Sequence, residues 1–388
     1  CITTRQQTPC CTRNKGSRVR LNAMGVSLPS KKTNTHISVK TEHILIIRFS
    51  AMGDVAMTVP VVQSLAKQYP ELRITFLSRP FARPLFEGLA PNVGFMGADI
   101  KKEYHGVGGL NKLYKRIVAK NITAVADLHN VLRSGYLRLR LNLARYRVEH
   151  IDKHRNERKK LVVQTNKRLV PLPTAFQNYA DVFAKLGYPI KMDFTSIFPP
   201  QGGNFRLLPP EIGTKKAFQE WIGVAPFAAH KQKVYPPEML EKVIKMIVRE
   251  HPSCRVFLFG KGPDEDPILN GIVERNPQCL NASAVLGGIA QELVLMSHLD
   301  VMISMDSANM HFASLVNTPV VSIWGATHPY AGFMGWGQKP QNAVQIDLAC
   351  RPCSIFGNKP CLRGDLACLR TISPEMVYER VKRVLSKR

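Results

Sequence analysis

The sequence predicts an α/β protein with two parallel-sheet domains. Strand-like apolar runs alternate with helix-like segments on both sides of a stretch rich in proline and glycine. The runs HILIIRF (43–49) and DVMISMD (300–306) are apolar almost throughout, which is typical of strands buried on both faces of a parallel sheet. Polar residues follow several of these runs, at the strand ends where α/β proteins bind ligands.

The first half of the chain shows three strand-like runs and three segments with helical spacing of apolar residues. The strands are expected at 43–49, 73–78 and 122–129, and the helices at 61–69, 110–120 and 176–187. Asp54 stands in the turn after the first strand, near the start of the next helix. In that helix Thr58 would be the N-cap, and Pro60 is tolerated in the first turn. Gly53 allows a close approach that a side chain would block.

The alternation restarts in the second half. Strands are expected at 221–227, 254–260, 300–306 and 319–325, and helices at 236–251, 267–276, 290–299 and 310–318. An amphipathic helix with Ser373 as its N-cap ends the chain. The expected organisation is therefore a basic extension at 1–40, a first domain at 41–195, a linker at 196–215, a second domain at 216–370 and a C-terminal helix at 371–388.

The net charge is the outlying property of the composition. The 388 residues include 54 Lys and Arg against 28 Asp and Glu, a formal charge of +26, with 45% apolar residues as in globular proteins. This excess indicates an anionic partner: a nucleic acid, a phosphorylated small molecule or an acidic membrane face. No stretch approaches about 18 apolar residues without charges, so a membrane-spanning helix is not expected.

Residues 1–41 contain eight Lys or Arg and no acid, and show no hydrophobic periodicity. Such a segment is expected to be disordered. It lacks the apolar region of a secretory signal and superficially matches an organellar transit peptide. We prefer to interpret it as a fragment or an upstream extension, with Met24 as a candidate start.

A second basic block at 132–170 holds 12 Lys or Arg against three acids. It fits either a solvated helix face followed by a loop, or a surface for a phosphorylated or membrane-bound substrate. Zinc-finger spacing, an RNA-recognition signature and a regular basic repeat are all missing, so a nucleic-acid partner is not expected.

Loops after the predicted strands carry the candidate functional residues, and the strand-end loops of two facing domains would line one cleft. Asp54 and His129 follow strands of the first domain, whereas the loops at 225–233, 260–265 and 305–311 belong to the second. Lysine ammonium groups suit a pyrophosphate, and a helix N-terminus offers N–H groups to an anion. Taken singly, each residue also has a plain structural interpretation, such as a cap, a surface lysine or a core histidine.

Three segments together resemble a known family: RFSAMGDVAMTVP (48–60), KVYP (233–236) and DSANMHFASLVNTPVVSIWGATHP (306–329). They are similar to the ADP-heptose:lipopolysaccharide heptosyltransferases, which form bacterial glycosyltransferase family 9, and the resemblance runs from about Glu42 to Leu385. It implies the GT-B fold, in which two Rossmann-like domains face each other across a cleft. The first domain would bind the acceptor and the second the nucleotide-sugar. The resemblance also implies inverting transfer without a metal or other cofactor.

The same resemblance assigns roles to single residues. Asp54 matches the general base, which would take the proton of the acceptor hydroxyl, and a modestly raised pKa would suit that work. Lys233 matches the lysine that binds the donor phosphates, and Asp306 the aspartate that holds the donor sugar or nearby groups. The other donor-binding residues expected are Lys231, Glu265, Gly287, Gly288, Ser307, Ala308 and His311. Ala308 stands where the family has glycine, which adds a methyl group near the phosphates.

The acceptor implied by the resemblance is a lipid-anchored lipopolysaccharide core of the Kdo–lipid A type. It carries carboxylates and phosphates at a membrane whose anionic surface attracts basic proteins. The expected acceptor-binding residues are Gly53, His129, Arg133, Arg138 and Arg140. The expected location is cytoplasmic, peripheral on the inner face of the bacterial inner membrane.

Four of the nine cysteines cluster near the C-terminus as C-x2-C-x7-C-x6-C: Cys350, Cys353, Cys361 and Cys368. Four thiols in a cytosolic chain can form a structural zinc site. Only one C-x-x-C pair is present, so we prefer reduced thiols packed in a loop and keep zinc as the alternative.

The predicted function is an inverting, metal-independent glycosyltransferase that moves a sugar, heptose from ADP-heptose, onto the lipopolysaccharide inner core. Alternatives are another nucleotide-sugar enzyme of the GT-B fold, with a different donor or acting as a 2-epimerase, and a basic nucleic-acid-binding protein. A nicotinamide oxidoreductase is disfavoured because no G-x-G-x-x-G follows the first strand of either domain.

Overall fold

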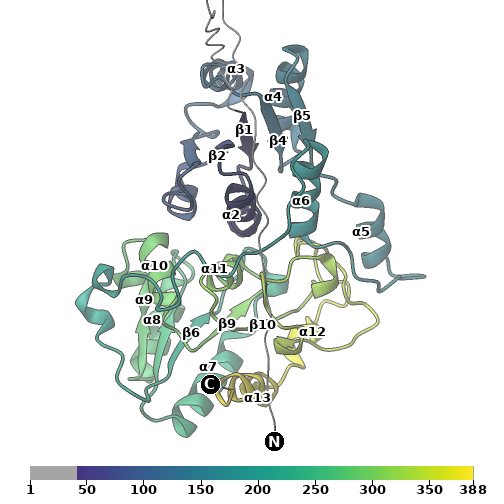
Figure 1. The fold of residues 1–388 in the computed structure, drawn as a ribbon. Coiled ribbons are helices and arrows are strands. Elements are labelled where there is room, and N and C mark those ends of the chain that lie inside the picture. Colours follow the sequence, from purple (N-terminus) through teal and green to yellow (C-terminus); the bar gives the residue numbers. More distant parts are fainter. Residues whose placement is uncertain (1–41, 388) are drawn as a thin grey trace, which may run out of the picture. The chain divides into compact units, whose positions relative to one another are not determined.

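The computed structural model describes residues 42–387, and these form two parallel β-sheets (Figure 1). The first sheet has the order β3-β2-β1-β4-β5. Its strands are β1 (His43–Ile47), β2 (Arg73–Ser78), β3 (Val93–Gly97), β4 (Ala124–Asp127) and β5 (Arg147–His150). The second sheet has the order β11-β10-β9-β6-β7-β8. Its strands are β6 (Trp221–Ala225), β7 (Arg255–Leu258), β8 (Cys279–Asn281), β9 (Val301–Met305), β10 (Val320–Ile323) and β11 (Ala343–Val344).

3-10 helices join β2 to β3 (Pro80–Leu85) and β10 to β11 (Pro329–Ala331 and Pro340–Asn342). α-Helices connect the other consecutive strands, as parallel pairing requires. Those of the first half are α1 (Met52–Ala56), α2 (Val59–Gln68), α3 (Gly106–Val118), α4 (Leu132–Leu143), α5 (Arg155–Val162) and α6 (Ala175–Lys185). Those of the second half are α7 (Pro237–Glu250), α8 (Asp266–Arg275), α9 (Ala282–Val285), α10 (Ile289–Met296), α11 (Ala308–Leu315), α12 (Ala367–Arg370) and α13 (Pro374–Leu385). None of the helices within residues 42–387 is long and apolar enough to cross a membrane.

The two-sheet α/β prediction is confirmed, and the strands that it omits are β3, β5, β8 and β11. β3 contains two glycines and β5 is mostly charged, so neither shows an apolar run. Ser373 caps α13 as predicted, because its hydroxyl accepts the Met376 N–H. Thr58 does precede α2, but its hydroxyl donates to the Val55 carbonyl at 2.7 Å and makes no cap hydrogen bond. The predicted disorder of 1–40 concerns residues outside the described range, and the domain boundaries stay a prediction.

Each sheet reverses its strand order beside its first strand. β1 lies between β2 and β4, and β6 lies between β7 and β9. At such a point the loops on either side leave in opposite directions and open a crevice at the carboxyl ends of the strands. The loops after β1 and β4, and after β6 and β9, therefore hold the positions where a ligand is expected.

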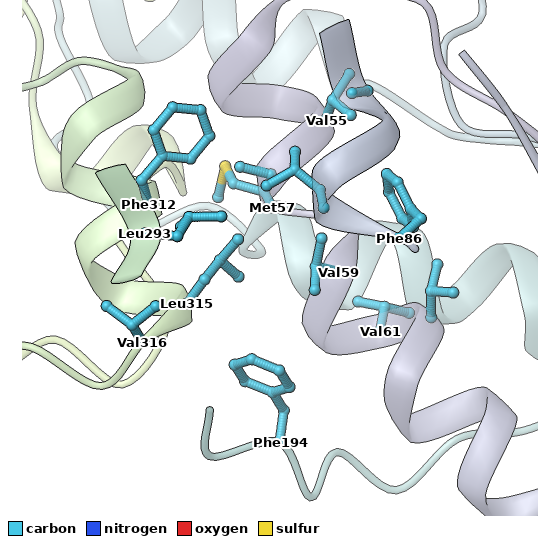
Figure 2. Packing of buried hydrophobic residues seen from close by; sticks show 14 of the residues in the cluster. Val55, Met57, Val59, Val61, Phe86, Phe194, Leu293, Phe312, Leu315 and Val316 are labelled. Atoms are coloured by element: carbon cyan, nitrogen blue, oxygen red, sulfur yellow. The ribbon is translucent and has the colours of Figure 1, made fainter. Parts of the chain in front are cut away.

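A buried apolar cluster joins the helices that follow β1 to those that flank β9. Met57 lies between α1 and α2, and Figure 2 shows its side chain directed toward Leu293 of α10 and Phe312 of α11. All three side chains are buried. This packing fixes α1, and with it Asp54, against the helix that begins just after Asp306.

An ion pair in the second half gives a pH-dependent contribution to stability. Hydrogen bonds from Arg275, together with Lys245 and Asn276, lower the pKa of the nearly buried Glu241 to about 2 from 4.5. A carboxyl pKa that is lower in the folded state stabilises the fold above the unfolded-state pKa, and that stability is lost as the pH falls toward the folded-state value. We expect Glu241→Gln to lower the free energy of unfolding by about 2 kcal/mol at pH 7, allowing for solvent around the half-exposed Arg275.

Chemical denaturation at pH 7 and at pH 3 measures this difference, which should shrink at the lower pH. The matched control is Glu250→Gln, whose partner Arg249 is 70% exposed on the same helix. A Glu241→Gln cost that is equal at both pH values would contradict the assignment.

Candidate active site

Asp54 lies in the first turn of α1, directly after the loop that leaves β1. Its Oδ2 accepts the Ala51 N–H at 3.1 Å and pairs with Arg48 Nη2 at 2.7 Å. The Arg48 side chain is 8% exposed and that of Asp54 is 26% exposed. Burial alone would raise the pKa of Asp54, but the Arg48 guanidinium, the Ala51 N–H and His311 together hold that pKa below its usual value. The expected modest rise in pKa is therefore wrong for this arrangement, because Arg48 was not foreseen.

Lys233 and Asp306 face each other across the second sheet's switch point, after β6 and β9. Lys233 Nζ lies 3.3 Å from Asp306 Oδ2, and the Thr327 hydroxyl donates to the same oxygen at 2.8 Å. Both charged side chains are largely buried. Asp306 contacts the Lys233 ammonium in this structure, and its expected role of holding the donor sugar or nearby donor groups stays a prediction.

The start of α11 lies against α1. A Cβ atom added at Gly53 would come within 2.8 Å of His311 Cδ2 and 3.4 Å of the Ala308 Cα, so glycine is what permits this approach. Burial lowers the pKa of His311 to about 4, which keeps the imidazole neutral at pH 7, and its Nδ1 is buried without a hydrogen-bond partner. Gly53 and His311 thus couple the two halves of the site.

A cavity of about 760 Å³ collects most of the predicted donor residues, and such a volume suits a nucleotide-sugar. The predicted residues that line it are Gly53, Asp54, Lys233, Glu265, Gly288, Asp306, Ser307, Ala308 and His311. Two of the predicted donor-binding residues do not line it. Lys231 is exposed at the start of a single 3-10 turn that carries Lys233 inward, and the Gly287 N–H donates instead to Gln291 Oε1.

The same cavity contains groups that the sequence reasoning missed, including Lys261 and Glu292. Burial raises the pKa of both Glu265 and Glu292. Glu265 accepts the Lys261 N–H at 2.9 Å, and Glu292 accepts the Ser283 hydroxyl at 3.2 Å. Glu292 lies inside α10 and inside the helix predicted at 290–299, where no motif marks it as functional.

A smaller cavity of about 170 Å³ adjoins the first on the side of the first sheet. Its ionisable lining residues are Arg48, Asp54, His129, Lys153, Arg158 and Tyr179. Asp54 lines both cavities and therefore stands at their junction. Lys153 and Arg158 lie in the predicted basic block, where no sequence pattern distinguishes them from the other cations.

The predicted acceptor residues divide into two groups. Gly53 and His129 line the cavities, and burial, with Arg48 and Lys153, lowers the pKa of His129 to about 3. Arg133, Arg138 and Arg140 line neither cavity, so the structure does not place them where they were expected. Arg138 instead pairs with the fully buried Asp127 at 3.2 Å, and Arg140 donates to Asn111 and lies over the Tyr114 ring. Arg133 is exposed at the start of α4.

The four clustered cysteines line one small cavity beneath the loop after β11: Cys350, Cys353, Cys361 and Cys368. Burial raises the pKa of Cys353, and it raises that of Cys368 to about 11, so both are protonated thiols at pH 7. Within residues 42–387, no three His, Cys, Asp or Glu residues are arranged to hold a metal ion. The choice between packed thiols and a structural zinc site stays a prediction.

Comparison with known proteins identifies the family. The sequence model described as glycosyltransferase family 9 (heptosyltransferase) matches residues 110–359. The chain belongs to glycosyltransferase family 9. It is accordingly a glycosyltransferase, which confirms the predicted class of enzyme and the resemblance that pointed to it.

Relatives are similar to this chain in sequence, and solved structures are similar to it in fold. Lipopolysaccharide heptosyltransferase 3 of Escherichia coli is 26% identical over 287 residues, which span 71% of this chain and 81% of that protein. The structure of E. coli ADP-heptose lps heptosyltransferase II matches with a TM-score of 0.62 at 17% identity, covering 89% of this chain and 99% of that one. The structure of E. coli heptosyltransferase WaaC with ADP also matches with a TM-score of 0.62, at 16% identity, covering 88% and 99%. The family 9 chain therefore has the predicted GT-B fold.

Proposed function

We propose that this family 9 enzyme transfers heptose from ADP-heptose to a lipopolysaccharide inner-core acceptor. The observation that carries the proposal is the position of Asp54, which lines both the large cavity with Lys233 and the smaller basic cavity. A base at that junction can meet an acceptor hydroxyl on one side and a donor sugar on the other. We further propose that 41–195 binds the acceptor and 216–370 the donor, joined by the linker at 196–215.

The donor would lie in the 760 Å³ cavity. Lys233 and the N–H groups at the start of α11 would hold the diphosphate, because an ammonium and a helix N-terminus both favour an anion. Glu265 and Glu292 can accept hydrogen bonds from ribose hydroxyls. The solved structures of relatives with ADP and with ADP-2-deoxy-2-fluoro heptose support the choice of nucleotide and sugar.

The chemistry would be a single displacement. The acceptor oxygen bonds to the anomeric carbon while the bond from that carbon to the diphosphate oxygen breaks, and ADP leaves with the electron pair. Asp54 takes the proton of the attacking hydroxyl. Attack from the face opposite the diphosphate inverts the anomeric centre. Lys233 and the α11 N-terminus supply the positive charge that the departing diphosphate needs, and on this ground we infer that no metal ion is required.

The acceptor and its membrane suggest where the enzyme works. The exposed side chains of Leu132, Leu139 and Leu143 form a stripe along α4, and the exposed Arg133 lies beside it. Apolar side chains flanked by cations suit the surface of an anionic bilayer. We propose a peripheral location on the cytoplasmic face of the inner membrane, where a lipid-anchored acceptor of the Kdo–lipid A type would be met.

Nucleotide-dependent thermal stability tests the donor assignment. ADP at 100 times its dissociation constant should stabilise the chain by about 2.7 kcal/mol, which appears as a rise in Tm. UDP and GDP at the same concentration should give smaller shifts, and mass spectrometry should detect heptose added to Kdo–lipid A when ADP-heptose is supplied. A larger shift with UDP, or transfer from UDP-sugars alone, would reject ADP-heptose as donor.

A further inference from the structure

The smaller cavity carries more positive charge than its single carboxylate can balance. Arg48, Lys153 and Arg158 line it together with Asp54 alone among the acids. Its histidine, His129, adds no charge, because burial lowers its pKa to about 3. The cavity therefore has a surplus of two positive charges beside the proposed base.

Two of these cations have no carboxylate partner within the described chain. Lys153 Nζ donates to the Asn130 carbonyl at 3.2 Å, and the Arg158 guanidinium lies 5.1 Å from the centroid of the Phe333 ring. Within the described chain neither forms an ion pair, although burial lowers the pKa of both. Holding unpaired cations in a partly buried cavity is unfavourable unless an anion enters.

The third cation, Arg48, forms an ion pair with the proposed base. Arg48 Nη2 lies 2.7 Å from Asp54 Oδ2, and its Nη1 donates to the Leu128 carbonyl at 2.6 Å. Its Nε is buried and has no hydrogen-bond partner, so the guanidinium of this buried residue retains one unused donor. While Arg48 is fully paired with Asp54, that carboxylate is a weak acceptor for a hydroxyl proton, because its negative charge is already neutralised.

We propose that the cavity binds an anionic oxygen group of the acceptor, a carboxylate or a phosphate, between Lys153 and Arg158, and that this group shares Arg48 and so frees Asp54 to act as the base. The proposal rests on the proposed function, since it concerns the acceptor side of the same site. It makes acceptor binding and base activation one event: an acceptor without the anion leaves Asp54 tied to Arg48. Arg48 is then a positioning residue, and Lys153 and Arg158 are specificity residues.

The size of the cavity limits where the anion can be on the acceptor. A cavity of about 170 Å³ has room for a small charged group such as a carboxylate or a phosphate. Asp54 shares this cavity, so the anion has to lie on the sugar that carries the attacking hydroxyl or on its immediate neighbour.

Acceptor kinetics with matched substrates test the proposal. Lys153→Gln and Arg158→Gln are each expected to raise the KM for Kdo–lipid A at least tenfold, with ADP affinity unchanged within twofold. The matched control is Lys159→Gln, an exposed cation of the same helix as Arg158. Each enzyme is assayed with Kdo–lipid A, with its Kdo methyl ester and with the dephosphorylated lipid.

The source of the anion is identified by the modified acceptor for which Lys153→Gln and Arg158→Gln no longer raise the KM. Equal KM values for the variants and the wild type with the methyl ester assign the carboxylate, whereas equal values with the dephosphorylated lipid assign a phosphate. Variants that behave like Lys159→Gln with intact Kdo–lipid A overturn the proposal. Failure of the wild type to bind ADP or to transfer sugar to any of these acceptors rejects the proposed function instead.

The dependence of the rate on pH tests the activation of Asp54 separately from acceptor binding, because weaker binding alone does not shift the acid limb of kcat. The ionisable groups that face Asp54 are Arg48, His129, Lys153, Arg158, Tyr179 and His311. Burial raises the pKa of Tyr179 away from the acid range, whereas His129 and His311, with a pKa of about 3 and about 4, titrate near the lowered pKa of Asp54. The informative quantity is therefore the displacement of the acid limb between kcat and kcat/KM, not its absolute position. The acid limb of kcat should lie at a higher pH than that of kcat/KM for the charged acceptor. Coincident limbs would show that Arg48 stays on Asp54 and would overturn the activation step.

Discussion

Asp54→Asn is expected to lower kcat by about 10³-fold while leaving the dissociation constant for ADP unchanged within twofold. The amide cannot accept the hydroxyl proton, and general base catalysis contributes about 10²–10⁴-fold. Asparagine keeps the shape of the side chain, and its amide oxygen can still accept the Ala51 N–H that Asp54 Oδ2 accepts at 3.1 Å. Initial rates at saturating donor and acceptor, together with ADP titration by calorimetry, measure the two quantities.

The same substitution removes the partner of Arg48, so loss of folding has to be separated from loss of the base. Truncating one side of a buried ion pair costs about 3–5 kcal/mol, and less is expected here because Asp54 is 26% exposed. The unfolding free energy of the variant is therefore measured alongside the rates. Asp193→Asn is the matched control, since Asp193 pairs with Lys67 on the surface. Turnover by folded Asp54→Asn within tenfold of the wild-type rate would remove Asp54 from the mechanism.

The sequence was informative wherever a residue follows a buried strand. Asp54, Lys233 and Asp306 were found because apolar runs locate the strands, and the carboxyl ends of parallel strands at a switch point share one crevice. The two-sheet architecture followed from the same periodicity. The sequence could not distinguish between two cations that lie close together along the chain. Lys231 and Lys233 both follow β6, and only the 3-10 turn that contains them decides which ammonium points inward.

The acceptor side could not be resolved in the same way, because its cations come from one long basic block. Nothing in the sequence distinguishes Arg138 from Arg158. In the structure the buried Asp127 at the end of β4 pairs with Arg138, which therefore does not line the cavity. Arg158 has no such partner and instead lies over Phe333, a residue about 170 positions away. Contacts at that separation depend on tertiary packing, which periodicity does not report.

The lowered pKa of Asp54 could not be predicted from the sequence, for a related reason. Arg48 belongs to the run that was predicted to be a strand, and the sequence does not show which way a charged side chain in such a run points. In the structure its guanidinium turns back to Asp54, six residues later, and is held there by the Leu128 carbonyl after β4. The electrostatics of the proposed base thus depend on pairing between two strands that the sequence could predict, and on a rotamer that it could not.

Lys233→Met is expected to weaken ADP binding by about 100-fold and to lower kcat/KM further, whereas Lys231→Met should change both by less than twofold. The first lysine lines the donor cavity with its ammonium fixed by Asp306 at 3.3 Å, and the second is exposed. A charge-assisted contact with a diphosphate is worth about 1.5–3 kcal/mol, which corresponds to about a 10–150-fold change in affinity.

Removing Lys233 also leaves Asp306 buried without its cation, so Lys233→Met confounds loss of a phosphate contact with repulsion between that carboxylate and the diphosphate. The double variant Lys233→Met with Asp306→Asn separates the two effects, because Thr327 can still donate to the asparagine side-chain oxygen. If the ammonium contacts the diphosphate, the double variant stays weak in ADP binding; if repulsion dominates, affinity returns toward the wild-type value. Equal ADP affinities for Lys233→Met and Lys231→Met would place the diphosphate elsewhere, and the assignment of the large cavity to the donor would fail with it.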